Sequence, residues 1–170
     1  MTGAMGLEAG YLAGDILLNL DTEDDDEIGV GCAGGIDVTA SKNYKEKILS
    51  SDATSYKITV KGLQGGHSGM DIHKGFGNSN KLMNRIHHAT QDFIQIVNID
   101  GGSLRNAIPR ESNSVVVVEN IDGFEETFKT ITESIYEEFS STEKDLIISF
   151  SLTDTPNSVM SKDDQTALIQ

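Results

Sequence analysis

Two glycine-rich stretches contain the residues of this chain that are best suited to chemistry. The first is the string GGHSGMDIH at residues 65–73, which follows a strand-like run. Its glycines allow positive φ and close approach of a ligand, and His67 can titrate, donate a hydrogen bond or bind a metal. The second, GGSLRNAIP at 101–109, also follows a strand-like run and carries Arg105 and Asn106. We interpret the two strand exits as the rim of a substrate site.

Other reactive side chains have simpler interpretations. The acidic run at 21–27 does not fit a calcium-binding loop, because Asp26 and Cys32 stand where such a loop needs glycine and glutamate. Ser68 is not a nucleophile of the G-x-S-x-G type, because the final glycine is missing. The glycine-rich setting of Cys32 favours a small buried residue over a nucleophile.

Three further histidines are candidate ligands or partners of His67. His73 is either such a partner or a solvated side chain, and we favour the solvated alternative. His87 and His88 are adjacent on a predicted helix, where one should face solvent and the other should lie at the edge of the core. We expect no metal site from this pair.

Periodic apolar residues indicate the elements that must position the two stretches. Alternation predicts strands at 56–61, 93–99, 114–119 and 146–152, and helical spacing predicts helices at 78–92 and from 122, with a third near 163. The order strand, helix, strand, strand, helix, strand is the split βαβ arrangement. We therefore expect an α+β fold of the ferredoxin-like type, a four-stranded antiparallel sheet with two helices on one face. A strand-rich segment at 15–38 should precede it.

Helix ends and one strand carry more specific predictions. Asn78 or Ser79 is suited to cap the first helix, and Asp122 with Glu125 resembles a capping box for the second. The valine run at 115–118 could lie at a sheet edge, and an exposed edge would favour dimerisation.

Composition excludes several classes of function. The chain has 170 residues and a net charge of −14, which argues against nucleic acid and anionic membranes as partners. A single cysteine excludes an internal disulfide and indicates a cytoplasmic protein. No apolar run approaches the ~18 residues of a membrane helix.

The motifs resemble those of the aminoacyl-histidine dipeptidase (Xaa-His dipeptidase) family of dinuclear zinc metallopeptidases. The string at 65–74 is similar to the lid-domain signature of that family, and GGSLRNAIP is similar to the G-G-x-x-x-N-x-I-P pattern of related metallopeptidases. The string LNLDTE at 18–23, followed by GCAGG at 31–35, is also similar to its counterpart there. Because three separate motifs occur in one order, chance is not a convincing explanation of the similarity.

The resemblance implies that this chain belongs to a longer enzyme with a two-segment catalytic domain and an inserted lid. It places 1–27 in the catalytic domain and 28–170 in a lid and dimerisation domain that is incomplete at its C-terminal end. The paired glutamates that bind metal and act as general base would precede Met1. We therefore expect the chain alone to be inactive and to bind no zinc.

Roles of individual residues also follow from the resemblance. It implies that Asp21 ligates one of two zinc ions, that His67 stabilises the oxyanion of the scissile carbonyl, and that Asn106 holds the substrate carboxylate. Arg105 is a weaker candidate than Asn106 for binding the substrate, because neighbouring residues in an extended segment point to opposite faces. A homo-oligomer through a sheet edge is expected, and whether His67 serves its own subunit or a neighbour is left open. The alternative is a non-catalytic dimerisation module of another metallopeptidase or deacylase with the same lid.

Overall fold

The computed structural model describes residues 6, 8, 10, 13–16, 26, 29–31, 36, 38–49 and 53–170. The chain divides into two compact units, 1–41 and 42–170, and every helix and strand of the described residues belongs to the second. The predicted strand at 15–20 and the strand-like piece at 28–38 lie largely outside the described residues, and Asp21 and Cys32 lie wholly outside them.

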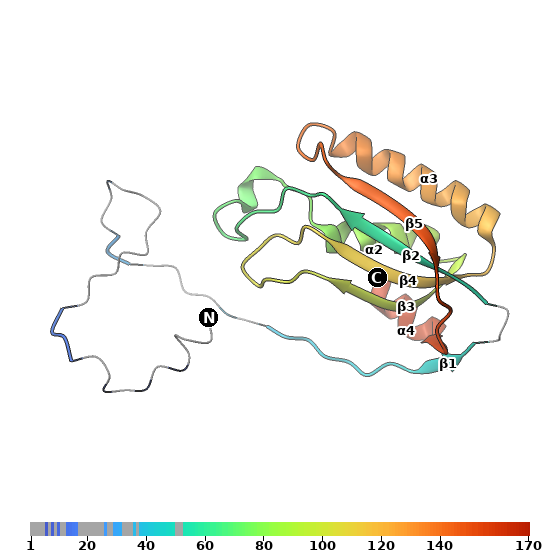
Figure 1. The fold of residues 1–170 in the computed structure, drawn as a ribbon, viewed down its shortest axis with the longest axis horizontal. Helices are drawn as coiled ribbons and strands as arrows, with labels where there is room; N and C mark the ends of the chain where they lie inside the picture. The colour runs from blue at the N-terminus through green and yellow to red at the C-terminus, as the bar shows by residue number, and fades with distance from the viewer. Residues whose placement is uncertain are drawn as a thin grey trace. The chain divides into compact units, whose positions relative to one another are not determined.

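A four-stranded antiparallel sheet forms the centre of unit 42–170 (Figure 1). Strand β2 (Thr54–Lys61) pairs with β4 (Ser112–Val118) on one side and with β5 (Ile147–Thr153) on the other. Strand β3 (Ile94–Gly101) pairs with the free side of β4, which gives the order β3-β4-β2-β5. The predicted antiparallel sheet is confirmed.

The valine run lies in the interior of this sheet. Val115 stands opposite Lys57 of β2 and opposite Asn98 of β3, so β4 is paired on both sides. The prediction that 115–118 could form an edge is therefore wrong. The physical reason for the error is that a continuous apolar run indicates covered faces, as the buried Val116, Val117 and Val118 have, but does not indicate which strands lie beside it.

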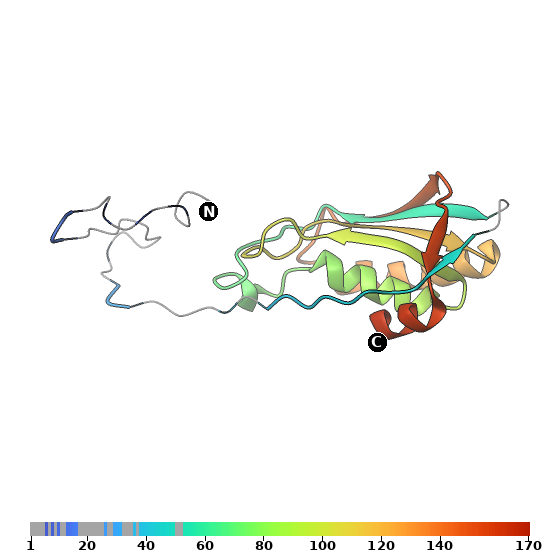
Figure 2. The same ribbon diagram turned by 90° about the horizontal axis from the view of Figure 1, so that it is seen from below.

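Two helices lie on the same face of the sheet, α2 (Ser79–Thr90) and α3 (Ile121–Glu138) (Figure 2). Helix α2 begins after Asn78, whose Oδ1 accepts hydrogen bonds from the amides of the second and third residues after it, at 3.1 and 3.2 Å. This confirms one of the two predicted caps.

The start of α3 differs from the predicted capping box. Asn120 is the cap, and its Oδ1 accepts a hydrogen bond from the amide of Gly123 at 3.2 Å. Asp122 already lies in the first turn of the helix, so its side chain cannot serve as the cap. There it still has a favourable position, because a carboxylate near the helix N-terminus is stabilised by the helix dipole.

The core lies between the sheet and these two helices. Phe124 of α3 is fully buried and meets Phe150 of β5 edge to face, with ring centroids 5.1 Å apart. Each such side chain stabilises the fold by about 1.5–3 kcal/mol. Of the histidine pair on α2, His88 faces solvent as predicted, but His87 lies deeper than predicted, with none of its surface exposed.

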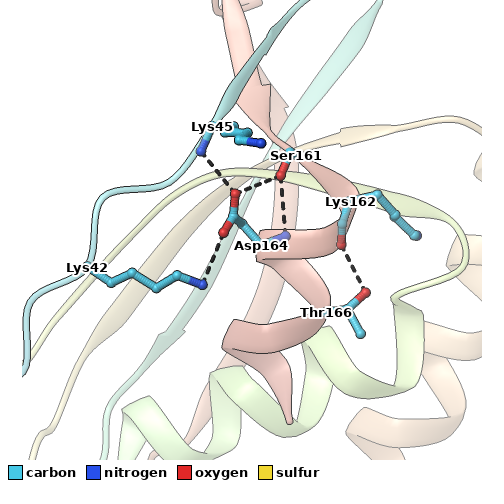
Figure 3. A network of polar contacts seen from close by, with 6 residues as sticks. All are labelled: Lys42, Lys45, Ser161, Lys162, Asp164 and Thr166. Carbon is cyan, nitrogen blue, oxygen red and sulfur yellow. Dashed lines mark hydrogen bonds and ion pairs between the residues drawn. The ribbon is translucent and has the colours of Figure 1, made fainter.

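A small second sheet holds the two ends of unit 42–170 together. Strand β1 (Glu46–Ile48) pairs with β6 (Ser158–Met160), which is followed by α4 (Lys162–Ile169). The carboxylate of Asp164 accepts hydrogen bonds from the amide of Lys45 (3.0 Å) and from the Ser161 hydroxyl (2.8 Å) (Figure 3). These bonds, with a 3.1 Å ion pair to Lys42, lower the pKa of Asp164 to about 2.

The two edge strands of the main sheet differ in what covers them. At β3, the buried side chain of Gln165 accepts a hydrogen bond from the amide of Ile96 (2.8 Å) and donates one to the carbonyl of Ile94 (3.1 Å). At β5, the Tyr136 hydroxyl accepts a hydrogen bond from the amide of Ile148 (2.7 Å). Alternate residues of a strand present their amides to the same side, so the amide of Leu152 faces the same outer edge as that of Ile148.

Candidate functional site

His67 lies in the loop at 62–78, which joins β2 to α2 and contains one turn of 3-10 helix, η1 (Ile72–Lys74). Within the loop, Gly66 has φ of +148°, and a Cβ at this position would stand 2.8 Å from Oδ2 of Asp71. The amide of Asp71 donates to the carbonyl of His67 at 2.9 Å, which closes a tight turn. The loop therefore needs glycine at 66 to bring its polar groups this close.

Two backbone amides fix the orientation of the His67 ring. The amides of Gly69 and Met70 both donate to Nδ1 of His67, at 3.1 and 3.2 Å. Because Nδ1 accepts these bonds, the proton of the neutral ring is on Nε2. His67 is exposed, so Nε2–H is a hydrogen-bond donor available to a ligand.

The carboxylate of Asp71 stabilises the same turn. Its Oδ2 accepts a hydrogen bond from the amide of His67 at 2.7 Å, and its Oδ1 binds Nζ of Lys74 at 2.6 Å. The hydrogen bond from Lys74, followed by the one from the His67 amide, lowers the pKa of Asp71. The carboxylate that shapes the turn therefore stays ionised at neutral pH.

The two glycine-rich stretches meet through their main chains. His67 forms an isolated antiparallel bridge with Ala107, and the amide of Ser68 donates to the carbonyl of Asn106 at 2.9 Å. On the other side, the amide of Ile108 donates to the carbonyl of Gly66 at 2.8 Å. The structure thus brings both strings to one place, with Asn106 one position away from the residue directly across from His67.

Arg105 and Asn106 occupy an exposed turn, which the amide of Ala107 closes by donating to the carbonyl of Leu104 at 3.3 Å. Beside this turn lies an open hollow of about 500 Å³, lined by residues that include Asp100, Leu104 and Arg110. A hollow of this volume is within the usual range for small-molecule sites, and its lining offers both apolar and charged groups.

Metal ligands do not gather in the described part of the chain. No group of three or more His, Cys, Asp or Glu side chains there could hold a metal ion, and Asp21 lies outside that part. A catalytic zinc ion needs three protein ligands, so the described residues do not fit a zinc site by themselves.

The helices of the described residues include none long and apolar enough to cross a membrane.

The sequence singled out His67 and Asn106 as candidates but did not indicate the groups that orient the ring. Asp71 stands four residues after the histidine, and Gly69 and Met70 stand two and three residues after it. That spacing is the available signal, because a polar side chain followed by a glycine-rich turn can bind its own following amides. We did not use it.

Comparisons with known proteins show what this chain is similar to in sequence and fold. The M20_dimer family, described as peptidase dimerisation domain, matches residues 52–145. Cytosol non-specific dipeptidase of Escherichia coli (strain K12) is 40% identical over 152 residues, which are 87% of this chain and 31% of that protein. The crystal structure of aminoacylhistidine dipeptidase from Vibrio alginolyticus superimposes with a TM-score of 0.75 and 41% identity, covering 99% of this chain and 35% of that one.

These matches confirm the resemblance that the motifs indicated. They also show that the chain spans about a third of the length of the relatives it matches.

Proposed function

Because this chain belongs to the peptidase dimerisation domain family, we propose that it is the lid and self-association domain of a longer dipeptidase. The activity of that longer protein would be hydrolysis of Xaa-His dipeptides. Both relatives are named dipeptidases, and the name of one, aminoacylhistidine dipeptidase, supports this choice. By this proposal the chain alone is inactive.

The observation that carries the proposal is the fixed ring of His67. Its Nδ1 is occupied by the amides of Gly69 and Met70, so the exposed Nε2–H is the group that meets a substrate. A carbonyl oxygen gains negative charge when its carbon is attacked, and a donor aimed at that oxygen binds the transition state more tightly than the substrate. Loss of one such donor lowers kcat by about 10²–10³-fold.

The neighbouring turn would hold the other end of the substrate. We assign Asn106 to the substrate carboxylate, because its amide group can donate hydrogen bonds and its backbone adjoins the His67 loop. Arg105, in the same exposed turn, is a second candidate for this contact.

The zinc ions of the proposed enzyme would be bound mainly by the rest of the longer protein. Asp21 would supply one ligand, by the resemblance in sequence. Zinc would activate the attacking water, and the described residues act only on the substrate. A cytoplasmic location is proposed from the single cysteine and from the name of the cytosolic relative.

The test is a kinetic comparison in the full-length enzyme, assayed with zinc on several aminoacyl-histidine dipeptides. His67→Ala should lower kcat by about 10²–10³-fold, because the donor acts in the transition state. Asn106→Ala should mainly raise KM. His73→Ala is the matched control, since His73 is exposed on the same loop, and it should leave both constants near wild type. An unchanged kcat in His67→Ala would remove His67 from the mechanism.

A second candidate function, a non-catalytic dimerisation module of another metallopeptidase or deacylase, rests on an open stretch at one edge of the sheet. Gln165 occupies the β3 edge at Ile94 and Ile96, and Tyr136 occupies the β5 edge at Ile148. Farther along β5, Leu152 is 70% exposed, so the edge there is open to pairing with a second copy. Light scattering of the chain at rising concentration tests this candidate, and a strict monomer would count against it. A lid can both self-associate and close over a site, so the two functions are compatible.

A further inference from the structure

Near its two ends, the loop that carries His67 is hydrogen-bonded to a single carboxylate. The amide of Gln64 donates to Oε2 of Glu143 at 2.7 Å, and the amide of Gly77 donates to Oε1 of the same side chain at 2.6 Å. The two oxygens of one carboxylate are close neighbours, so these bonds draw the two ends of the loop together. Residues 64–77 thus form a loop with a closed neck, the arrangement of an Ω-loop.

Glu143 is placed for this contact by the turn that follows α3. Its own amide donates to the carbonyl of Phe139 at 2.8 Å, and its carbonyl accepts from the amide of Leu146 at 3.2 Å. The residue is only 5% exposed. A buried carboxylate is costly unless hydrogen bonds compensate for the lost water, and the two loop amides provide them.

The neck is packed too closely for a larger residue at its far end. A Cβ at Gly77 would stand 2.6 Å from Cδ2 of Leu63 and 3.3 Å from Oε1 of Glu143. The short approach of the Gly77 amide to the carboxylate therefore depends on the absence of a side chain. The neck is built from backbone groups of the loop and one side chain from a distant part of the sequence.

We infer that Glu143 is a positioning residue for His67. The bonds inside the loop, from Gly69, Met70 and Asp71, set the ring relative to its own turn. The bonds at the neck, together with the bridge from His67 to Ala107, hold that turn against the sheet. Removing the neck bonds loosens the turn, so the amides of Gly69 and Met70 spend less time on Nδ1 and the ring loses its fixed direction. The inference rests on the proposed role of His67, but its first test does not need catalysis.

The first test is nuclear magnetic resonance on the 170-residue chain, with Glu143→Gln compared with wild type. Glutamine offers one acceptor oxygen in place of two, and its amino group repels one of the loop amides. Hydrogen exchange at the amides of Gln64 and Gly77 should become about tenfold faster or more, while exchange at Val116 in the centre of β4 stays unchanged. The ring ¹⁵N shifts of His67 should move from one Nε2–H tautomer towards a mixture.

Two further variants keep the test decisive. Glu137→Gln, at an exposed position of α3, makes the same change of charge and should match wild type in every measurement. Glu143→Asp keeps both oxygens but withdraws them by one methylene, so its exchange rates should fall between wild type and Glu143→Gln. It also provides the comparison if Glu143→Gln does not fold. Wild-type exchange at Gln64 and Gly77 in both Glu143 variants, or an unchanged His67 tautomer, would overturn the inference.

The kinetic test separates this inference from the proposed function. In the full-length enzyme, Glu143→Gln should lower kcat about tenfold with little change in KM, since the ring acts in the transition state. If the loop amides exchange faster and the tautomer shifts while kcat stays at the wild-type value, the positioning role stands. The unchanged kcat would then count against the catalytic role of His67 in the proposed function.

Discussion

Acid should destabilise this domain through one buried histidine. His87 on α2 has none of its surface exposed, and neither ring nitrogen has a hydrogen-bond partner among the described residues. Burial disfavours the charged imidazolium and lowers the pKa of His87 from 6.5 to about 4. Replacing His87 by leucine removes the titrating group and puts an apolar side chain of similar size in its place.

The sign follows from which state binds the proton. As the pH falls below 6.5, the unfolded chain protonates His87, while the folded domain does so only near pH 4. The unfolded state is therefore favoured progressively between these values. At about 1.36 kcal/mol per pH unit, the loss amounts to about 2.5 kcal/mol by pH 4.5 and about 3 kcal/mol at lower pH. Above 6.5 the ring is neutral in both states and the loss disappears.

The measurement is urea unfolding of the wild-type chain and of His87→Leu, at several pH values from 7.5 to 4.5. The free energy of unfolding of the wild type should fall relative to that of the variant by about 2.5 kcal/mol over this range. Asp71 and Asp164 do not confound the comparison, because their lowered pKa values confine their effects to more acidic solution and both remain in the variant. Parallel pH profiles for the two proteins would refute the reasoning.

Two further substitutions test contacts that hold the domain together, and a third, with its control, tests self-association at the β5 edge. Asp164→Asn should speed amide exchange in 42–48, and the difference from wild type should vanish as the pH falls from 3.8 towards 2, where the wild-type carboxylate also protonates. Gln165→Leu should cost about 2–4 kcal/mol in urea unfolding, because it leaves two buried backbone groups of β3 unpaired; a cost below about 0.5 kcal/mol contradicts this. Leu152→Lys should shift light scattering towards monomer, whereas Leu168→Lys, at another exposed leucine, should not.

The sheet and its two long helices could be predicted from sequence because their apolar residues repeat with the correct periods. Phe124 and Phe128 recur at helical spacing and are both buried, and Tyr56 to Lys61 alternates as a half-buried strand should. The position of β4 was harder, because a continuous valine run says that both faces are covered but not which strands lie beside it. The capping error at α3 has a similar origin. Asn120 and Asp122 are both suitable N-caps, and only the path of the folded backbone decides at which of them the helix begins.

The parts that could not be predicted depend on contacts between residues far apart in sequence. Strands β1 and β6 have three residues each, too few for a periodic signal, and they form because they pair with each other. Glu143 resembles any polar residue of a turn until the fold brings Gln64 and Gly77 to it. The site shows the same division. His67 and Asn106 were visible in their motifs, whereas the bridge between His67 and Ala107 exists only in the folded chain.

The pairing of β1 with β6 has a consequence for how such a domain can be carried by a host polypeptide. Its entry and exit strands run side by side, and Asp164 ties the residues just before β1 to the helix just after β6. Because these two segments lie side by side, such a domain can be spliced into a surface turn of another protein without forcing that protein apart.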